Sequence, residues 1–207
     1  MATDKRFLDG LADQKVLPIF RGSHQEIYAS LDLMRPLNLK FIELTTSIPN
    51  WQKILLDLSS EYAVGVGTLR TQSEIDDAIA NGARFLVSFG SFPALLAAHS
   101  VLPVIPGAFT PSEFLQLFQS GIGIVKLYPA SNFGSKYLSD LKVLLPELQF
   151  IVTGGIKNSS SDINEWLKAG AIAVGIGSSL GNPIANPDEF KKAVEELANA
   201  LHSNKQG

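Results

Sequence analysis

Short apolar runs alternate with amphipathic stretches along almost the whole sequence, and this alternation constrains the fold more than any other feature. The predicted strands lie at 16–20, 39–44, 63–66, 84–87, 104–105, 122–126, 150–152 and 171–174. The predicted helices follow them at 23–35, 49–58, 72–80, 93–99, 111–118, 135–145, 161–168 and 188–201. Short apolar strands that alternate with helices are typical of a parallel sheet covered on both faces. Eight such units predict an α/β fold, the closed (β/α)8 TIM barrel.

No linker-like stretch interrupts these units. The 207 residues suffice for one sizeable core and are few for two, so we expect a single (β/α)8 barrel domain over 1–207. Apolar residues at helical spacing in 4–13 predict a short N-terminal helix before the barrel. An open doubly wound sheet is the alternative, and it is weaker because no Gly-x-Gly-x-x-Gly turn follows the first strand.

Composition excludes several classes of partner and site. The net charge is −3 and the basic residues are scattered, so we expect no nucleic-acid partner. No apolar run reaches about 18 residues, so no membrane span is expected, and the N-terminal residues lack a secretory signal. We therefore expect a cytoplasmic protein. Cysteine is absent, and the three histidines are not paired at helical spacing, so we expect neither thiolate chemistry nor a metal site.

Polar residues, glycines and prolines gather at the predicted strand ends. In a parallel barrel all strands end at one rim, where active sites are built from several strands. The candidate site residues at this rim are Arg21, Glu43, Thr45, Thr68, Pro106, Lys126, Tyr128, Thr153, Gly154, Gly155, Gly177 and Ser178.

Lys126 and Glu43 are the candidates for chemistry. Lys126 ends an apolar run, where desolvation favours the neutral amine that attacks carbonyl groups. Glu43 is a carboxylate within an apolar strand, and a glutamate facing the barrel interior needs a partner or a raised pKa. Together the two side chains suit imine formation with a keto substrate and proton transfer to it. The alternatives are a lysine whose ammonium reaches water and a glutamate that faces outward or bonds to a neighbouring backbone group.

The other candidates suit the binding of anions. Gly154, Gly155, Gly177 and Ser178 end the last two strands, where barrels frequently bind phosphate through backbone N–H groups. Arg21 can form a fork to a carboxylate, or it is a surface ion-pair residue. Thr68 can donate its hydroxyl to a ligand, or it caps the following helix.

The strand-end motifs resemble those of the 2-keto-3-deoxy-6-phosphogluconate / 4-hydroxy-2-oxoglutarate aldolases. These motifs are Gly65-Val66-Gly67-Thr68, Ile105-Pro106-Gly107, Lys126-Leu127-Tyr128-Pro129-Ala130, Thr153-Gly154-Gly155-Ile156 and Gly175-Ile176-Gly177-Ser178. The resemblance covers about residues 16 to 200 and implies a metal-free class I aldolase that needs no cofactor and forms a homotrimer. It implies that Lys126 is the Schiff-base residue and Glu43 the general acid/base. It further implies that Arg21 and Thr68 hold the carboxylate, and that the glycine pairs and Ser178 hold the phosphate.

Some positions depart from the gluconate-type pattern. Ser47 stands where many members carry an arginine, and Phe89 follows Ser88 where the family has a proline. The first-strand arginine and two dipeptides, Asn50-Trp51 and Phe133-Gly134, resemble the 2-keto-3-deoxy-6-phosphogalactonate aldolases, whereas Thr153 resembles the gluconate type. We therefore interpret the chain as a lyase that splits a small phosphorylated keto acid, a 2-keto-3-deoxy-6-phospho sugar acid, into pyruvate and glyceraldehyde 3-phosphate. The alternatives are a phosphate-binding isomerase or decarboxylase barrel and a catalytically silent sugar-phosphate sensor.

Overall fold

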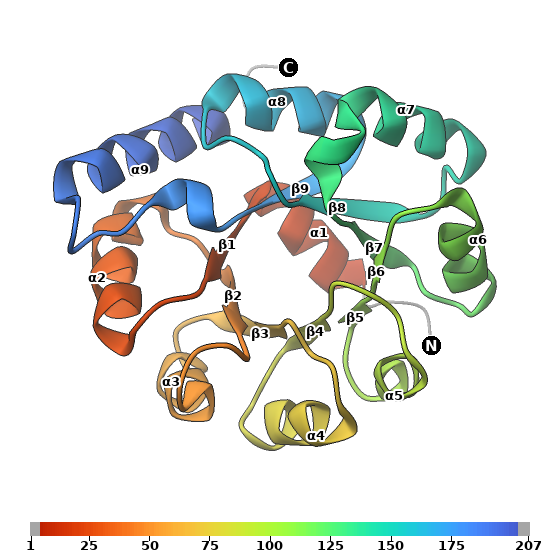
Figure 1. Cartoon of the computed structure of the whole chain (residues 1–207), viewed down its shortest axis with the longest axis horizontal. Coiled ribbons are helices and arrows are strands. Elements are labelled where there is room, and N and C mark those ends of the chain that lie inside the picture. The colour runs from red at the N-terminus through yellow and green to blue at the C-terminus, as the bar shows by residue number, and fades with distance from the viewer. Residues whose placement is uncertain (1–4, 203–207) are drawn as a thin grey trace.

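The computed structural model describes residues 5–202 and confirms the α/β parallel barrel with its N-terminal helix (Figure 1). The strands are β1 (Val16–Phe20), β2 (Phe41–Thr45), β3 (Ala63–Gly67), β4 (Phe85–Val87), β5 (Val104–Ile105), β6 (Gly107–Ala108), β7 (Ile124–Leu127), β8 (Gln149–Thr153) and β9 (Ala171–Ile176). The α-helices are α1 (Lys5–Gln14), α2 (His24–Met34), α3 (Trp51–Leu58), α4 (Gln72–Ala80), α5 (Pro93–Ala97), α6 (Pro111–Gln119), α7 (Gly134–Leu144), α8 (Ser160–Lys168) and α9 (Pro187–His202). Short 3-10 helices are η1 (Arg35–Leu37), η2 (Ala98–Ser100), η3 (Ala130–Asn132) and η4 (Ser178–Leu180).

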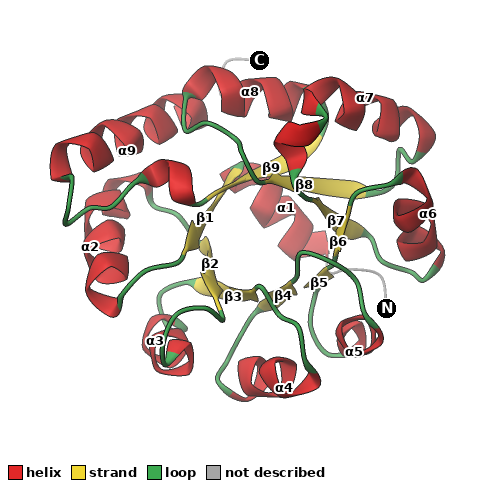
Figure 2. Cartoon of the chain, in the orientation of Figure 1, coloured by secondary structure: helices red, strands yellow, loops and turns green. Residues whose placement is uncertain are grey.

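The strands form one parallel sheet in the order β5-β4-β3-β2-β1-β9-β8-β7-β6, and the helices surround it (Figure 2). The single fifth strand that the sequence predicts is in fact two short strands, β5 and β6, separated by Pro106. Proline has no N–H to donate, so the ladder is interrupted at this residue. The Pro106 carbonyl still accepts the N–H of Lys126 at 2.9 Å, so the sheet remains connected to β7 beside the lysine.

Helix α1 lies across one end of the barrel and closes it. Its Phe7 ring lies 5.2 Å from the ring of Phe85 and 5.9 Å from that of Phe41, between ring centroids. The buried cluster that fills this end comprises Phe7, Leu11, Leu17, Phe85, Val87, Ile105, Ile124, Ile151 and Ala173. Within residues 5–202 the barrel is therefore packed with side chains at this end, and the opposite rim is left for a ligand to enter.

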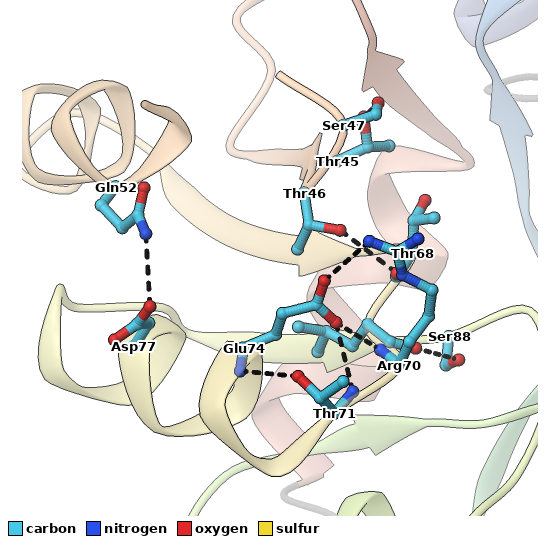
Figure 3. A network of polar contacts seen from close by, with 11 residues as sticks. Thr45, Thr46, Ser47, Gln52, Thr68, Arg70, Thr71, Glu74, Asp77 and Ser88 are labelled. Atoms are coloured by element: carbon cyan, nitrogen blue, oxygen red, sulfur yellow. Dashed lines mark hydrogen bonds and ion pairs between the residues drawn. The ribbon is translucent and has the colours of Figure 1, made fainter. Parts of the chain in front are cut away.

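Hydrogen bonds at the helix starts fix where the strand-end loops stop. Capping boxes begin α2 at Ser23 and Glu26, and α4 at Thr71 and Glu74, the second of which is seen in Figure 3. Each box satisfies backbone N–H groups that a helix N-terminus leaves without partners. The short loops that carry Arg21 and Thr68 are thereby held between a strand and a capped helix. Among the helices that the structure describes, none has the length and apolar character needed to cross a membrane.

Candidate active site

A cavity of about 420 Å³ opens at the rim where the strands end. The predicted site residues in its wall are Arg21, Thr68, Lys126, Tyr128, Thr153, Gly154, Gly155, Gly177 and Ser178. The wall also contains residues that were not predicted from the sequence, namely Ile19, Phe89, Ile156, Gly175 and Ser179. Ile19 and Gly175 lie two positions before Arg21 and Gly177, so the period-two alternation of β1 and β9 was the signal that could have found them.

Lys126 lies inside strand β7. The strand runs from Ile124 to Leu127, whereas the sequence predicted 122–126 with the lysine at its end. Lys126 is only 3% exposed, so its ammonium does not reach solvent in the way that the alternative interpretation requires. Its Nζ lies 5.4 Å from the ring centroid of Tyr128. Burial lowers the pKa of Lys126, the Glu43 carboxylate partly opposes this, and the positive charge of Arg21 lowers the pKa further.

Glu43 lies on β2 directly beside this lysine. Its side chain has no exposed surface, and its Oε1 lies 3.9 Å from Lys126 Nζ. The outward-facing alternative is therefore wrong. Glu43 itself is not in the cavity wall but lies beneath it. A Cβ atom at Gly67 of the neighbouring strand β3 would collide with Oε1, so this glycine makes the space for the carboxylate.

The carboxylate oxygens of Glu43 can accept hydrogen bonds that the described chain does not supply. Neither oxygen has a hydrogen-bond partner within the part of the chain that the structure describes. Buried polar groups normally have partners, and those that do not are frequently functional. The hydroxyl of Thr153 is in the same condition, and Thr153 is in the wall of the cavity. The region at and beneath the base of the cavity thus combines a desolvated amine with buried polar oxygens whose hydrogen-bonding capacity is unused.

The glycines at the ends of β8 and β9 bring backbone N–H groups to the cavity. The backbone φ angle is 94° at Gly154 and 75° at Gly155, in a region that residues other than glycine rarely adopt. A Cβ at Gly155 would in addition collide with the side chain of Ser131. No backbone or side-chain acceptor in the described segment 5–202 takes the N–H groups of Gly155, Ile156, Ser178 or Ser179. These donors suit an anion with several oxygen atoms.

Arg21 follows β1 and lines the cavity. Its guanidinium forms no ion pair with any of residues 5–202. Its Nη1 lies 2.8 Å from the position that a Gly177 Cβ would occupy. Arg21 thus lies beside the glycine at the β9 end, and its charge is available to an anionic ligand in the cavity.

Thr68 has an unusual backbone conformation, with φ of 63°. Positive φ is strained for a β-branched residue, and such strain persists only where neighbours enforce it. The hydroxyl of Thr46 donates to the Thr68 carbonyl at 3.2 Å, and that of Ser88 donates to the Leu69 carbonyl at 2.7 Å (Figure 3). The N-cap of α4 is Thr71, so Thr68 is not the helix cap that the sequence left open.

Two further candidate residues lie outside the cavity wall. Thr45 is fully buried, and its hydroxyl donates to the Phe20 carbonyl at 3.1 Å and lies 2.7 Å from Ser47 Oγ. Pro106 is buried at the barrel seam, where its carbonyl holds the backbone of Lys126. Both residues support the strands that carry the site.

The two positions that depart from the family pattern differ in their surroundings. The Ser47 hydroxyl is hydrogen-bonded to that of Thr45, and Phe89, which is half exposed, forms part of the cavity wall. Across residues 5–202, no three His, Asp or Glu side chains are grouped as a metal site requires.

A sequence model of the family described as "KDPG and KHG aldolase" matches residues 9–195 of this chain. The chain belongs to the KDPG and KHG aldolase family. This membership confirms the resemblance that the strand-end motifs indicated, and it places the chain among the aldolase lyases.

Relatives of this chain include both phosphogalactonate and phosphogluconate aldolases. The chain is 24% identical to the 2-dehydro-3-deoxy-6-phosphogalactonate aldolase of Escherichia coli (strain K12), over 80% of this chain and 83% of that protein. It is 31% identical to the probable 2-dehydro-3-deoxy-6-phosphogalactonate aldolase of Rhizobium meliloti (strain 1021), over 65% of each chain. The structure of the KDPG aldolase from Legionella pneumophila, with pyruvate captured at low pH as a covalent carbinolamine intermediate, is 26% identical. It matches with a TM-score of 0.80 over 94% of this chain and 97% of that one.

Proposed function

We propose that this protein is a class I aldolase that cleaves a 2-keto-3-deoxy-6-phospho sugar acid to pyruvate and glyceraldehyde 3-phosphate. The observation that carries the proposal is the buried pair at the base of the cavity, in which Lys126 Nζ lies 3.9 Å from Glu43 Oε1. Burial favours the neutral amine of Lys126, which is the nucleophilic form. The carbinolamine that the Legionella pneumophila relative forms with pyruvate supports the same chemistry here.

The reaction assigns one role to each member of the pair. The amine of Lys126 adds to the substrate ketone, and loss of water gives an iminium ion. Glu43, acting through a water, removes the proton of the fourth-carbon hydroxyl, and the bond between the third and fourth carbons breaks. Its electrons flow to the iminium nitrogen and give an enamine, while the aldehyde departs. Glu43 then returns a proton to the third carbon, and hydrolysis of the imine releases pyruvate and regenerates Lys126.

In this proposal the carboxylate and the phosphate of the substrate bind to different groups of the protein. Arg21 and Thr68 hold the carboxylate, and the N–H groups at Gly154, Gly155, Gly177 and Ser178 hold the phosphate. Tyr128 and Thr153 line the path between them. We further propose that the protein functions as a homotrimer, as the family resemblance implies. Gluconate and galactonate substrates differ in configuration at one carbon, and comparing their cleavage rates decides between them.

Trapping with borohydride tests the proposed function directly. Treatment with borohydride and pyruvate reduces an imine to a stable amine, so we expect one pyruvyl adduct on Lys126, identified by mass mapping of peptides. Cleavage of the phosphorylated substrate is measured in parallel through release of pyruvate. Turnover without any trapped adduct would indicate isomerase or decarboxylase chemistry, and trapping without turnover would indicate a sensor.

Arg21→Met should weaken pyruvate binding by about 30-fold, because a hydrogen bond to a charged group contributes roughly 2 kcal/mol. Methionine keeps most of the side-chain packing, so the fold should persist. Removing the positive charge also takes away one cause of the low pKa of Lys126, so that pKa rises. The pH at which borohydride inactivation with pyruvate is half-maximal should therefore move upward.

Arg21→Lys is the matched control for this prediction. It keeps the charge, so the pH profile should stay in place, but it loses the two-pronged fork and should recover only part of the affinity. Unchanged pyruvate binding in a folded Arg21→Met protein, together with weaker binding of the phosphorylated substrate, would assign Arg21 to the phosphate instead.

A further inference from the structure

A hydrogen bond links helix α2 to the loop that follows η4, between residues far apart in sequence. The amide nitrogen of Asn182 donates to Oε1 of Glu26, and we call this pair the latch. The amide oxygen of Asn182 accepts the N–H groups of Ile184 and Ala185, each at 2.9 Å, so the Asn182 side chain also shapes its own loop.

Glu26 is equally fixed on its own side. Its Oε2 accepts the N–H of Ser23 at 2.6 Å, and the Ser23 hydroxyl accepts the N–H of Glu26 at 3.3 Å. These bonds from Ser23, and then the bond from Asn182, lower the pKa of Glu26. The carboxylate is thus ionised at neutral pH and accepts a charge-assisted hydrogen bond from the loop.

The latch joins two segments that border the proposed substrate cavity. On one side, Ser23 follows Arg21 and Gly22 in the loop after β1. On the other side, Asn182 lies shortly after Ser178 and Ser179, both of which line the cavity wall. The placement of the backbone N–H groups of η4 in the cavity therefore depends on how the loop that follows them is held.

The packing between them is incomplete. A second cavity of about 260 Å³ lies between the two segments, and its wall includes Arg21, Glu26, Ser178 and Asn182. Leu180 and Pro183 are buried, but they border this cavity and do not fill it. Because dispersion contacts are missing where the cavity lies, the polar latch carries more of the restraint on this loop.

We propose that Asn182 and Glu26 are positioning residues that set the affinity of the enzyme for the phosphate end of its substrate. The inference rests on the proposed function, because it takes the N–H groups beyond β9 as the phosphate site. The latch contacts neither the reacting carbons nor Lys126, so imine formation does not depend on it.

Asn182→Ala tests this inference. We expect the KM for the phosphorylated keto acid to rise about 10-fold, since a hydrogen bond to a charged group is lost. The pyruvate concentration that gives half-maximal borohydride inactivation should change less than about twofold, because pyruvate carries no phosphate. Asn182→Asp should be worse than Asn182→Ala, because it places a second carboxylate against Glu26. Glu26→Gln keeps one carbonyl acceptor and should be milder than either.

Gln52→Ala is the matched control, because it removes an amide–carboxylate contact between α3 and α4, with Gln52 Nε2 lying 3.3 Å from Asp77 Oδ2 (Figure 3). It should leave both kinetic readouts unchanged. Ser178→Asp is the positive comparator, because it puts a negative charge at the phosphate site itself.

Three outcomes overturn the inference. An equal rise in the substrate KM and in the pyruvate requirement would make the latch purely structural. A wild-type preference for phosphorylated over unphosphorylated substrate that survives in Asn182→Ala would overturn the latch and leave the proposed function standing. A wild-type enzyme without such a preference would overturn both. If Asn182→Ala does not fold, Glu26→Gln carries the same comparison.

Discussion

Lys126→Met should reduce carbon–carbon cleavage by about 10⁴-fold or more, the scale of loss seen when a covalent nucleophile is removed. Without the amine no iminium forms, so the substrate has no electron sink, and borohydride with pyruvate should leave no adduct. The fold should survive because methionine occupies similar space to the lysine stem in the closed interior. Pyruvate release and mass mapping measure the two effects.

Lys142 supplies the control for this experiment. Its pKa is also lowered by burial, and its Nζ donates to the carbonyls of Pro146 and Leu148 at 2.7 and 2.9 Å. It does not line the cavity, so Lys142→Met should cost stability and leave trapping intact. A pyruvyl adduct on Lys142, or full activity in Lys126→Met, would show that the covalent mechanism is assigned to the wrong residue.

Glu43→Gln has the second largest expected effect, a loss of about 10²–10⁴-fold in cleavage, as is typical when a positioned acid/base is removed. Glutamine has the same shape, and the space that Gly67 leaves accommodates it. Pyruvate should still be trapped on Lys126, but exchange of its methyl protons with deuterated solvent, followed by NMR, should slow by a comparable factor.

Glu43→Asp separates position from chemistry. The carboxylate is retained but withdrawn by one methylene, so both rates should lie between those of the wild type and Glu43→Gln. An unchanged deuterium-exchange rate in the folded Glu43→Gln protein would mean that another group moves the proton. Thr153 would be the next candidate, because it lines the cavity and its hydroxyl has no hydrogen-bond partner in the described chain.

The barrel was predictable because each strand and helix shows its own periodicity. Apolar runs of about five residues followed by amphipathic stretches require a parallel sheet wrapped by helices, and that rhythm needs no long-range information. The split at Pro106 was not predicted, because it depends on which neighbours pair with each half of the strand. The position of α1 was missed for the same reason, since Phe7 packs against rings that come from β2 and β4.

The candidate site was predictable to the extent that strand ends converge. Topology alone brings Arg21, Lys126 and Gly177 to one cavity. The sequence did not indicate that Glu43 lies beneath the wall, because its depth is set by the missing side chain of Gly67 on the next strand. Nor did it indicate the contact between Glu26 and Asn182, since the capping box explains Glu26 without Asn182 and only the fold brings these two distant residues together.

The closure of one end of the barrel by α1 has a consequence for the order of events in the proposed reaction. In that reaction the three-carbon keto acid would be bonded to Lys126 at depth, and the aldehyde would form on the side of the rim that α1 leaves open. Pyruvate stays bonded to Lys126 until the imine is hydrolysed, and the aldehyde lies on the side of the open rim, so the aldehyde departs first and pyruvate last. In the synthetic direction pyruvate must load before its partner. A helix that contributes no atom to the chemistry thus reinforces an order that the covalent bond to Lys126 already sets.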